Sequence, residues 1–230
     1  KQLERQREEF VANVSHELRT PLSLIKGYTE TLLDGARNDP AVAERFLKII
    51  ERNTQRLDLL IQDLLTISAL ESGRMKLELQ PVNLHTLTEK IFNDLHAKSE
   101  NKNVALLNEV PELIARADMI RLDQVIANLV DNAIKYGRSE GHVKVGGKKL
   151  EDGRLEMFVQ DDGPGIPPEA LDRVFERFYR VDKARSRDQG GTGLGLSIVK
   201  HIVHAHDGEV WAKSELGKGA TFFFTLPAEK

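Results

Sequence analysis

The sequence predicts two domains of different fold class: an all-α helical hairpin that pairs into a dimeric four-helix bundle, then an α+β sandwich with a mixed sheet and helices on one face. Three observations predict this. The N-terminal part carries two apolar seams at helical spacing, the pattern changes after Gly73, and the remainder mixes strand-like and helix-like segments without strict βαβ alternation. We therefore assign residues 1–73 to the first domain and residues 74–230 to the second.

The two seams predict a hairpin of two long helices. The first seam repeats every three or four residues through Phe10, Val14, Leu18, Pro21, Ile25, Tyr28 and Leu32. The segment GARNDP at 35–40 ends this helix and places Pro40 at the start of the next. The second seam runs through Val42, Phe46, Ile49, Asn53, Leu57, Leu60, Leu64 and Ile67. One hairpin alone cannot bury both stripes, so we expect a homodimer.

Two seam residues carry further expectations. Asn53 is either a buried amide that fixes the register of the bundle or a residue at the seam's edge that contacts water. Pro21 leaves the carbonyl of Glu17 without its helical partner, so we expect the helix to kink or loosen there. Pro21 and the segment near Gly73 are the expected compliant points between the domains.

Local signals predict the elements of the second domain. Strands are expected at 75–81, 104–110, 113–118, 209–215 and 220–227, with a hairpin over 143–163 that turns at Asp152-Gly153. Helices are expected at 83–96, at 118–136 with Asp118 as N-cap and Gly137 at the end, and at 194–206. A long polar stretch, 177–193, precedes the last helix.

Composition limits the classes of partner. The net charge of −3 gives no basic excess of the kind that binds nucleic acid or an anionic membrane, so any phosphate site must be local. The absence of cysteine excludes disulfides and thiolate metal sites and fits a reducing cytosolic compartment. No apolar run reaches the length of a membrane span. Because the chain begins at Lys1 within a helix-favouring run, we expect a piece of a longer protein.

A polar stripe on the first helix contains the first candidate for chemistry. Asn13, His16, Glu17 and Thr20 fall at i, i+3, i+4 and i+7, a stripe expected opposite the apolar seam. His16 is therefore predicted to face solvent. Taken alone, an exposed histidine is more often an ordinary surface residue, so the functional interpretation depends on the segments downstream.

The segment NLVDNAIKYG places amide side chains on one side of a helix. Asn128 and Asn132 lie one turn apart, with Lys135 on the same side. Amide oxygens are hard ligands that can complete a magnesium shell shared with phosphates, and lysine supplies a point charge. Taken alone, two such asparagines are more often surface amides.

Two glycine-rich segments add a candidate anion site. QDDGPGIPP places Asp161 before Gly163 and Gly165, which allow close backbone approach. GGTGLGLSIVK carries four glycines between 190 and 195 into a helix start, where free N–H groups face an anion. This phosphate cradle is neither a Walker loop nor a dinucleotide fingerprint.

Together and in this order, these segments resemble the sensor histidine kinases of two-component signalling over almost the whole chain. FVANVSHELRTPL resembles the H-box, NLVDNAIKYG the N-box, DDGPGIP and GGTGLGLSIVK the two glycine boxes, and RVFERFYR the F-box. The resemblance implies a dimerisation and histidine-phosphotransfer hairpin followed by an ATP-binding domain of the gyrase, chaperone, kinase and MutL type. It further implies that this chain is the cytoplasmic, soluble portion of a membrane-anchored sensor.

The resemblance also implies roles for single residues. His16 is implied as phosphoacceptor, Arg180 as the F-box arginine that approaches the γ-phosphate, and 177–193 as a mobile lid over ATP. Asp161 is implied to accept a hydrogen bond from the adenine amino group. Asn128 and Asn132 are implied to bind Mg²⁺. The residues implied in ATP binding are Asn128, Asn132, Lys135, Tyr136, Asp161, Gly163, Gly165, Ile166, Arg180, Gly191, Thr192, Gly193, Leu194, Gly195 and Leu196.

The expected chemistry requires a neutral imidazole at His16, because one ring nitrogen must offer a free lone pair to phosphorus. Glu17 would take the proton of the other nitrogen as general base; the alternative is a solvated helix charge. Arg180 and magnesium would offset charge on the transferring group. Arg180 could instead pair with Asp182 or Glu176 at the surface.

The resemblance implies a response-regulator receiver domain as partner, with an aspartate that receives the phosphoryl group from His16. Thr20 lies one turn away and could orient a water that dephosphorylates the regulator. Replacing Thr20 by alanine should then lower phosphatase activity and leave autophosphorylation largely intact.

Two rival functions stay open at this stage. A hydrolytic ATPase of the same superfold would carry a glutamate base at the position of Asn128, which argues against hydrolysis. A dimeric scaffold that binds ATP only as a structural ligand would bear no acid-labile label after incubation with γ-labelled ATP.

Overall fold

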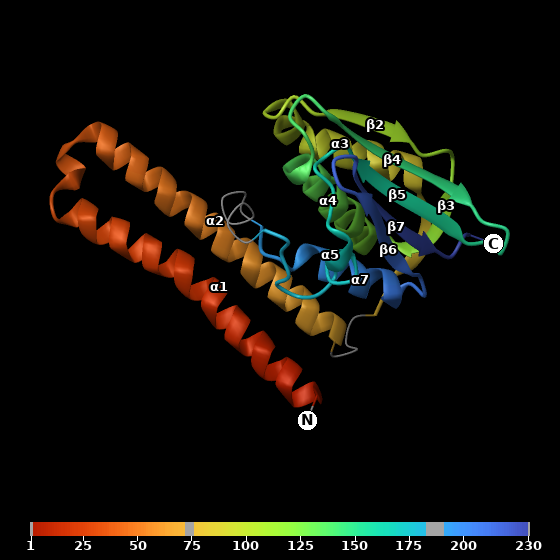
Figure 1. Ribbon diagram of the computed structural model, residues 1–230, viewed down its shortest axis with the longest axis horizontal. Helices are drawn as coiled ribbons and strands as arrows, with labels where there is room; N and C mark the ends of the chain where they lie inside the picture. Colours follow the sequence, from red (N-terminus) through yellow and green to blue (C-terminus); the bar gives the residue numbers. More distant parts are fainter. Residues whose placement is uncertain (1, 72–75, 183–190, 230) are drawn as a thin grey trace.

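The computed structural model describes residues 2–71, 76–182 and 191–229, and two parts make up this described chain. A long helical hairpin extends well past a second part in which helices cover a sheet, and α2 lies between α1 and that second part (Figure 1). Gly73, the predicted domain boundary, lies outside the described residues. No helix among the described residues is long and apolar enough to cross a membrane.

The hairpin consists of α1 (Gln2–Leu33), the short 3₁₀ helix η1 (Ala36–Asn38) and α2 (Pro40–Glu71). Asp39 caps α2, since its Oδ1 accepts hydrogen bonds from the N–H groups of Ala41 at 3.0 Å and Val42 at 3.2 Å. The helices pack through the predicted seams, with the Tyr28 and Phe46 ring centroids 4.9 Å apart. Helix α1 continues without interruption past Pro21, which is buried.

The surroundings of Asn53 decide between the two predicted alternatives, a buried amide and a residue that contacts water. Its side chain is 6% exposed, and its Nδ2 donates to the Ile49 carbonyl of the same helix at 2.8 Å. It is therefore a buried amide rather than a residue at the water's edge. Large apolar side chains elsewhere on the hairpin remain exposed, namely Val11, Leu22, Leu24, Leu33, Leu47, Leu59, Ile61 and Leu65.

The second part is built on a five-stranded mixed sheet in the order β2-β4-β5-β7-β6. Its strands are β2 (Ala105–Glu109), β4 (His142–Lys149), β5 (Leu155–Asp161), β6 (Val210–Glu215) and β7 (Gly219–Leu226). β2 and β4 are parallel and the other pairs antiparallel. A separate ribbon pairs β1 (Leu79–Asn83) with β3 (Ile114–Asp118).

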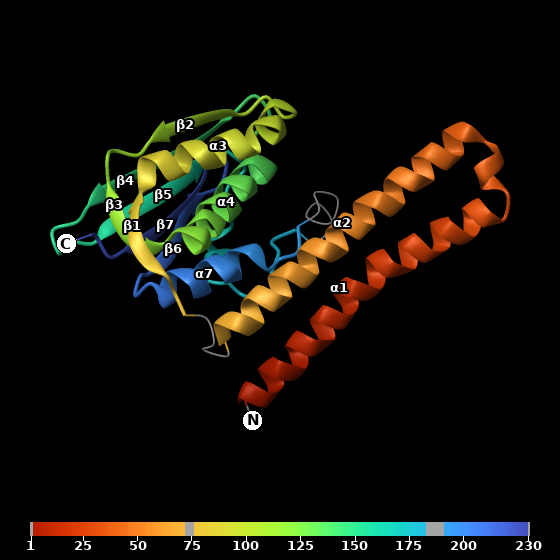
Figure 2. The ribbon, with the colours of Figure 1, turned by 180° about the vertical axis from the view of Figure 1, so that it is seen from behind.

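Three long helices cover one face of this sheet: α3 (Leu84–Glu100), α4 (Met119–Tyr136) and α7 (Gly195–Ala205) (Figure 2). The short α5 (Pro168–Leu171) was not predicted. Helix α4 turns Leu122, Val125 and Leu129 fully inward, and the alternate residues of β5 do the same from the sheet. This packing leaves the opposite edge of α4 free to line a pocket.

Most predicted elements are confirmed, with shifted ends. The helix predicted at 83–96 extends to Glu100, and the strand predicted at 75–81 begins only at Leu79. Two capping residues explain the well-placed starts: Asn83 accepts from the N–H of Thr86, and Asp118 from that of Arg121.

Candidate functional site

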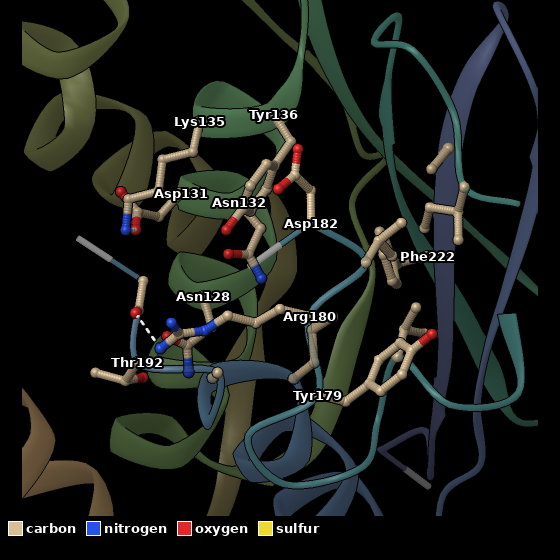
Figure 3. Close-up of a pocket in the computed structure, with 18 of the residues that line it drawn as sticks. Asn128, Asp131, Asn132, Lys135, Tyr136, Tyr179, Arg180, Asp182, Thr192 and Phe222 are labelled. Carbon is tan, nitrogen blue, oxygen red and sulfur yellow. Dashed lines mark hydrogen bonds and ion pairs between the residues drawn. The ribbon is translucent and has the colours of Figure 1, made fainter. Parts of the chain in front are cut away.

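A pocket of about 300 Å³ lies where α4 faces the two glycine-rich segments (Figure 3). Its wall includes the end of β5, residues 164–166, residues 179–182, the start of α7 and one turn of α2. The lining residues predicted from the sequence are Asn128, Asn132, Lys135, Tyr136, Asp161, Gly165, Ile166, Arg180, Gly191, Thr192, Gly193, Gly195 and Leu196. The pocket therefore unites residues of the second domain that lie as far apart in the sequence as Asn128 and Phe222.

Helix α4 supplies a polar wall. Asn128, Asn132 and Lys135 point into the pocket from one edge of the helix, as predicted (Figure 3). The Nδ2 of Asn128 is buried and has no hydrogen-bond partner among the described residues. A buried donor without a partner is costly, so a ligand acceptor at this point would remove the cost. Lys135 Nζ forms an ion pair of 2.5 Å with Asp131.

Asp161 is the last residue of β5 and lines the pocket. Its Oδ1 accepts hydrogen bonds from the N–H groups of Gly163 at 2.8 Å and Ala220 at 3.3 Å. Burial raises the pKa of this carboxyl group above its ordinary value, and the neighbouring charge of Asp162 raises it further. Asp162 itself turns to His142, whose N–H donates to it at 3.1 Å, and does not line the pocket.

The glycine-rich loops are close-packed at two positions with positive φ. Gly165 has φ +78°, and a Cβ there would lie 2.3 Å from the Glu215 carbonyl oxygen. Gly193 has φ +76° and would place a Cβ 3.0 Å from the Cα of Phe178. Only glycine fits both positions without strain. Helix α7 begins beside them without a side-chain cap, which leaves its first N–H groups to an anion.

Two residues predicted to bind the nucleotide do not line the pocket. Leu194 is fully buried in the core beneath it. Gly163 lies behind Asp161, where a Cβ would be 2.8 Å from both the Asp161 Oδ1 and the Tyr136 carbonyl oxygen. Both residues therefore support the wall from the protein side. Residues 183–190 of the predicted lid, which include Gly190, lie outside the described residues.

The pocket also contains residues that were not predicted individually, although some of them lie in the predicted lid, the F-box or a glycine box. Asp131 lies three residues after Asn128, so helical spacing alone could have identified it. The others are Leu59, Asp63, Pro164, Val174, Tyr179, Val181, Asp182, Ala220 and Phe222. Leu59 and Asp63 belong to α2, and Thr192 Oγ1 donates to Asp63 Oδ2 at 2.7 Å. Burial raises the pKa of Asp63.

Arg180 joins the pocket to the helix that carries His16. Its side chain is 6% exposed, and the guanidinium donates to the Gly191 carbonyl at 2.6 Å and to Glu17 Oε2 at 3.1 Å. The same Glu17 oxygen accepts from Arg56 of α2 at 2.9 Å. The alternative of a surface pair for Arg180 is wrong because the group is buried, and Glu176 pairs with Arg173.

The position of Glu17 also corrects a prediction. Its carboxylate lies between α2 and the second domain, 17% exposed, and not on a solvent-facing stripe. The prediction of a solvent-facing stripe was based on residue spacing along α1 alone. It could not take account of Arg56 and Arg180, which approach Glu17 from other parts of the chain. The alternative of a solvated helix charge is equally wrong.

His16 is exposed, as predicted, and lies outside the pocket. It borders a shallow hollow on α1 together with Arg19, Thr20, Ser23 and Leu24. Thr20 Oγ1 donates to the His16 carbonyl at 3.2 Å, and no described residue hydrogen-bonds to the imidazole. The ring is therefore accessible to an incoming group.

The oxygen donors fit a magnesium ion that arrives with phosphates. Asn128 and Asn132 offer two amide oxygens one turn apart, with Asp131 beside them. The described residues contain no cluster of three or more His, Cys, Asp or Glu side chains that could hold a metal alone. Mg²⁺ keeps several waters and takes few protein ligands when phosphates share its shell, which agrees with this sparse donor set.

Comparison with known proteins gives consistent results for both parts of the chain. Residues 6–73 match the model of the His Kinase A (phospho-acceptor) domain, and residues 117–230 match that of the histidine kinase-, DNA gyrase B- and HSP90-like ATPases. The chain is 41% identical over 231 aligned residues to the sensor protein kinase WalK of Staphylococcus epidermidis, covering 99% of this chain and 38% of that protein.

Solved structures agree with these matches. The catalytic domain of histidine kinase ThkA is 30% identical, with a TM-score of 0.58 over 66% of this chain and 99% of that domain. ThkA in complex with the response regulator protein TrrA is 26% identical, with a TM-score of 0.78 over 98% of this chain and 65% of that chain. The chain thus spans about two fifths of the length of the curated relative and nearly all of the catalytic domain.

Proposed function

The chain belongs to the sensor histidine kinases of two-component signalling, and from that premise we propose that it transfers the γ-phosphoryl group of ATP to His16 and then to an aspartate of a response regulator. One observation carries this proposal. Arg180 lines the nucleotide pocket and forms an ion pair with Glu17, the residue next to His16, so a group from the donor site already reaches the acceptor helix.

The pocket offers complementary groups to each part of ATP. The Asp161 carboxylate, which lines the pocket, would accept a hydrogen bond from the adenine amino group. Lys135, the free Nδ2 of Asn128 and the start of α7 supply positive charge and N–H donors to the phosphates. Asn128 and Asn132 would hold Mg²⁺, which supplies charge neutralisation at the β- and γ-phosphates when bound.

In the transfer step, His16 and Glu17 of this chain act on the γ-phosphoryl group of ATP. The unprotonated ring nitrogen of His16 attacks the γ-phosphorus, a phosphorus–nitrogen bond forms, and the bond to the leaving oxygen of ADP breaks. Positive charge then develops on the imidazole, and Glu17 takes the proton from the second ring nitrogen. In the described arrangement Glu17 is bound to two arginines, so it must leave them before it acts as base.

The two sites must approach each other for the reaction. His16 borders a hollow on α1, whereas the pocket is walled by α2 and the second domain. The second domain must therefore move along the hairpin, or reach His16 of a second protomer. The apolar side chains exposed on α1 and α2 support a homodimer with a four-helix bundle.

A response-regulator receiver domain is the proposed second substrate. The likeness to a kinase solved in complex with a response regulator supports this partner. We also propose a phosphatase duty in which Thr20, one turn from His16, orients the attacking water. The cytoplasmic position and the membrane-anchored parent remain predictions.

The proposal is tested by incubating the chain with γ-labelled ATP and Mg²⁺. We expect an acid-labile, alkali-stable label on the unaltered protein and none on His16→Gln, since the amide has no nucleophilic nitrogen. His96→Gln, which removes an exposed histidine of α3, is the matched control and should label normally. Equal labelling of His16→Gln would exclude His16 as the acceptor.

The same experiment separates the two rivals. Rapid multiple-turnover release of phosphate without a labelled protein would indicate a hydrolytic ATPase. Saturable ATP binding with neither label nor phosphate release would indicate a scaffold.

A further inference from the structure

Lys102 lies in the turn between α3 and β2, outside the pocket, and its ammonium group reaches the C-terminal end of α4. Its Nζ donates to the carbonyl oxygens of Ile134, Lys135 and Gly137, each at 2.7 Å. The last carbonyls of a helix lack partners within the helix and carry the negative end of its dipole. The three N–H groups of one ammonium therefore satisfy three such carbonyls at once.

The backbone that Lys102 holds is the wall of the base subsite. Lys135 and Tyr136 line the pocket, and Tyr136 and Gly137 pack against the loop that follows Asp161. A Cβ at Gly163 would lie 2.8 Å from the Tyr136 carbonyl oxygen and 3.2 Å from the Gly137 Cα. Because the two segments are close-packed at this contact, a movement of the end of α4 must also move the loop that follows Asp161.

Lys102 also acts on Asp161 through its charge. Burial raises the pKa of the Asp161 carboxyl group, and the negative charge of Asp162 adds to this effect. The Lys102 ammonium opposes both and favours the ionised form. An ionised carboxylate only accepts hydrogen bonds, which suits an amino group and not a carbonyl.

We infer that Lys102 is a positioning residue for nucleotide selectivity: it fixes the last turn of α4 against the Asp161–Gly163 loop and so orients the carboxylate that recognises adenine. This inference rests on the proposed function, in which the pocket binds ATP with its base at Asp161. Lys102 itself need not contact the nucleotide.

The test compares ATP with inosine triphosphate, in which a carbonyl replaces the amino group of the base. Lys102→Met keeps the apolar stem and removes the three donors and the charge. We expect the Kd for Mg-ATP to rise about tenfold, and the Kd for Mg-ITP to rise less, because a displaced and more readily protonated Asp161 can donate to the carbonyl. The preference for ATP over ITP should therefore narrow.

Two further variants control the comparison. Lys102→Arg keeps the charge and several donors, so it should retain most of the preference for ATP. Lys90→Met removes a lysine of α3 whose Nζ pairs with Asp123 of α4, at the far end of α4 from the pocket. It should leave both Kd values unchanged. Calorimetric titration measures the affinities, and the unfolding temperature without nucleotide reports stability.

The outcomes are distinct. An unchanged ATP affinity in Lys102→Met, or an equal loss for ATP and ITP, would overturn the inference, because a merely structural role predicts equal losses. If Lys102→Met fails to fold, Lys102→Gln takes its place, because it retains an amide donor without the charge. It must then show a narrowed preference for ATP over ITP, and an unchanged ratio of the two Kd values would overturn the inference. If the unaltered chain binds neither nucleotide, the proposed function itself fails.

Discussion

The buried charge of Asp161 lowers the stability of the fold, and in the proposed function the same charge recognises adenine. The residue is 7% exposed, its carboxylate accepts hydrogen bonds from two backbone N–H groups, and burial raises the pKa of the carboxyl group. A folded pKa above the unfolded value means that the ionised group destabilises the fold at neutral pH, and that protonation at lower pH relieves this cost. In the proposed function, the charge is kept because the carboxylate accepts a hydrogen bond from the adenine amino group.

Asp161→Asn should separate these two effects. The amide oxygen can still accept from Gly163 and Ala220, so the unfolding temperature at pH 7 should stay equal or rise, since the buried charge is gone. The affinity for ATP should fall about ten- to a hundredfold, because a charged acceptor for the amino group is lost. Thermal unfolding and titration with Mg-ATP measure the two effects. A variant that is clearly less stable and still binds ATP normally would contradict this account.

At this scale the sequence predicted residues whose signal is local. Asn128, Asn132 and Lys135 share one helix edge, and Asp161 with the glycines sits in short segments of unusual composition. Asp63 could not be predicted in the same way. It lies on a regular helix far from the glycine boxes in sequence, and only the docking of the second domain brings it to Thr192.

Helix α4 is the element that positions the site, and its two ends are secured differently. At the start, Asp118 Oδ1 accepts from the Arg121 N–H at 3.1 Å, and Oδ2 from the Glu78 N–H at 3.0 Å. The backbone N–H of Asp118 donates to Nε2 of the buried His206 at the end of α7. Burial raises the pKa of Asp118, but the hydrogen bonds more than offset this, so its pKa lies below the ordinary value.

Asp118→Ala should destabilise the chain by about 1–2 kcal/mol at pH 7 through loss of the cap. A depressed folded pKa gives stability that is present above the unfolded pKa of about 4 and is lost as the pH falls through the folded value. The difference between wild type and variant should therefore shrink below about pH 4. Urea unfolding at pH 7 and pH 3 measures it. Asp123→Ala, in the same helix and without a capping bond, is the control variant. If the stability difference between wild type and Asp118→Ala did not change with pH, the argument would be refuted.

Element starts were predictable where a capping side chain marks them, and ends were less so. Asn83 and Asp118 signalled the starts of α3 and α4. The pairing of β1 with β3 in a separate ribbon depends on contacts between segments about 35 residues apart, which alternation within either segment does not encode.

For the whole molecule, the described arrangement docks the second domain on the hairpin. Glu17 binds Arg180, Asp63 binds Thr192, and the Phe10 and Phe178 ring centroids lie 5.9 Å apart. Leu59 and Asp63 thereby complete one wall of the pocket. This wall therefore places the Asp63 carboxylate in the pocket that we propose for ATP, which is a polyanion.

Asp63→Asn should therefore raise the affinity for ATP. The amide oxygen can still accept from Thr192, while the like charge that opposes the phosphates is removed. We expect the Kd for Mg-ATP to fall about threefold or more, given the strength of charge interactions near a protein surface. Asp58→Asn, an exposed aspartate on the same helix, is the matched control. Equal affinities in wild type and Asp63→Asn would show that α2 leaves the pocket before ATP enters.

Because Leu59 comes from the hairpin and Tyr179 from the second domain, a small molecule that binds both would act as glue between the two halves of the enzyme. Such a compound would arrest catalysis in two ways, by occupying the pocket proposed for ATP and by immobilising the two parts against each other. Its potency would vanish on the isolated catalytic fragment, so screens for it must use the intact chain.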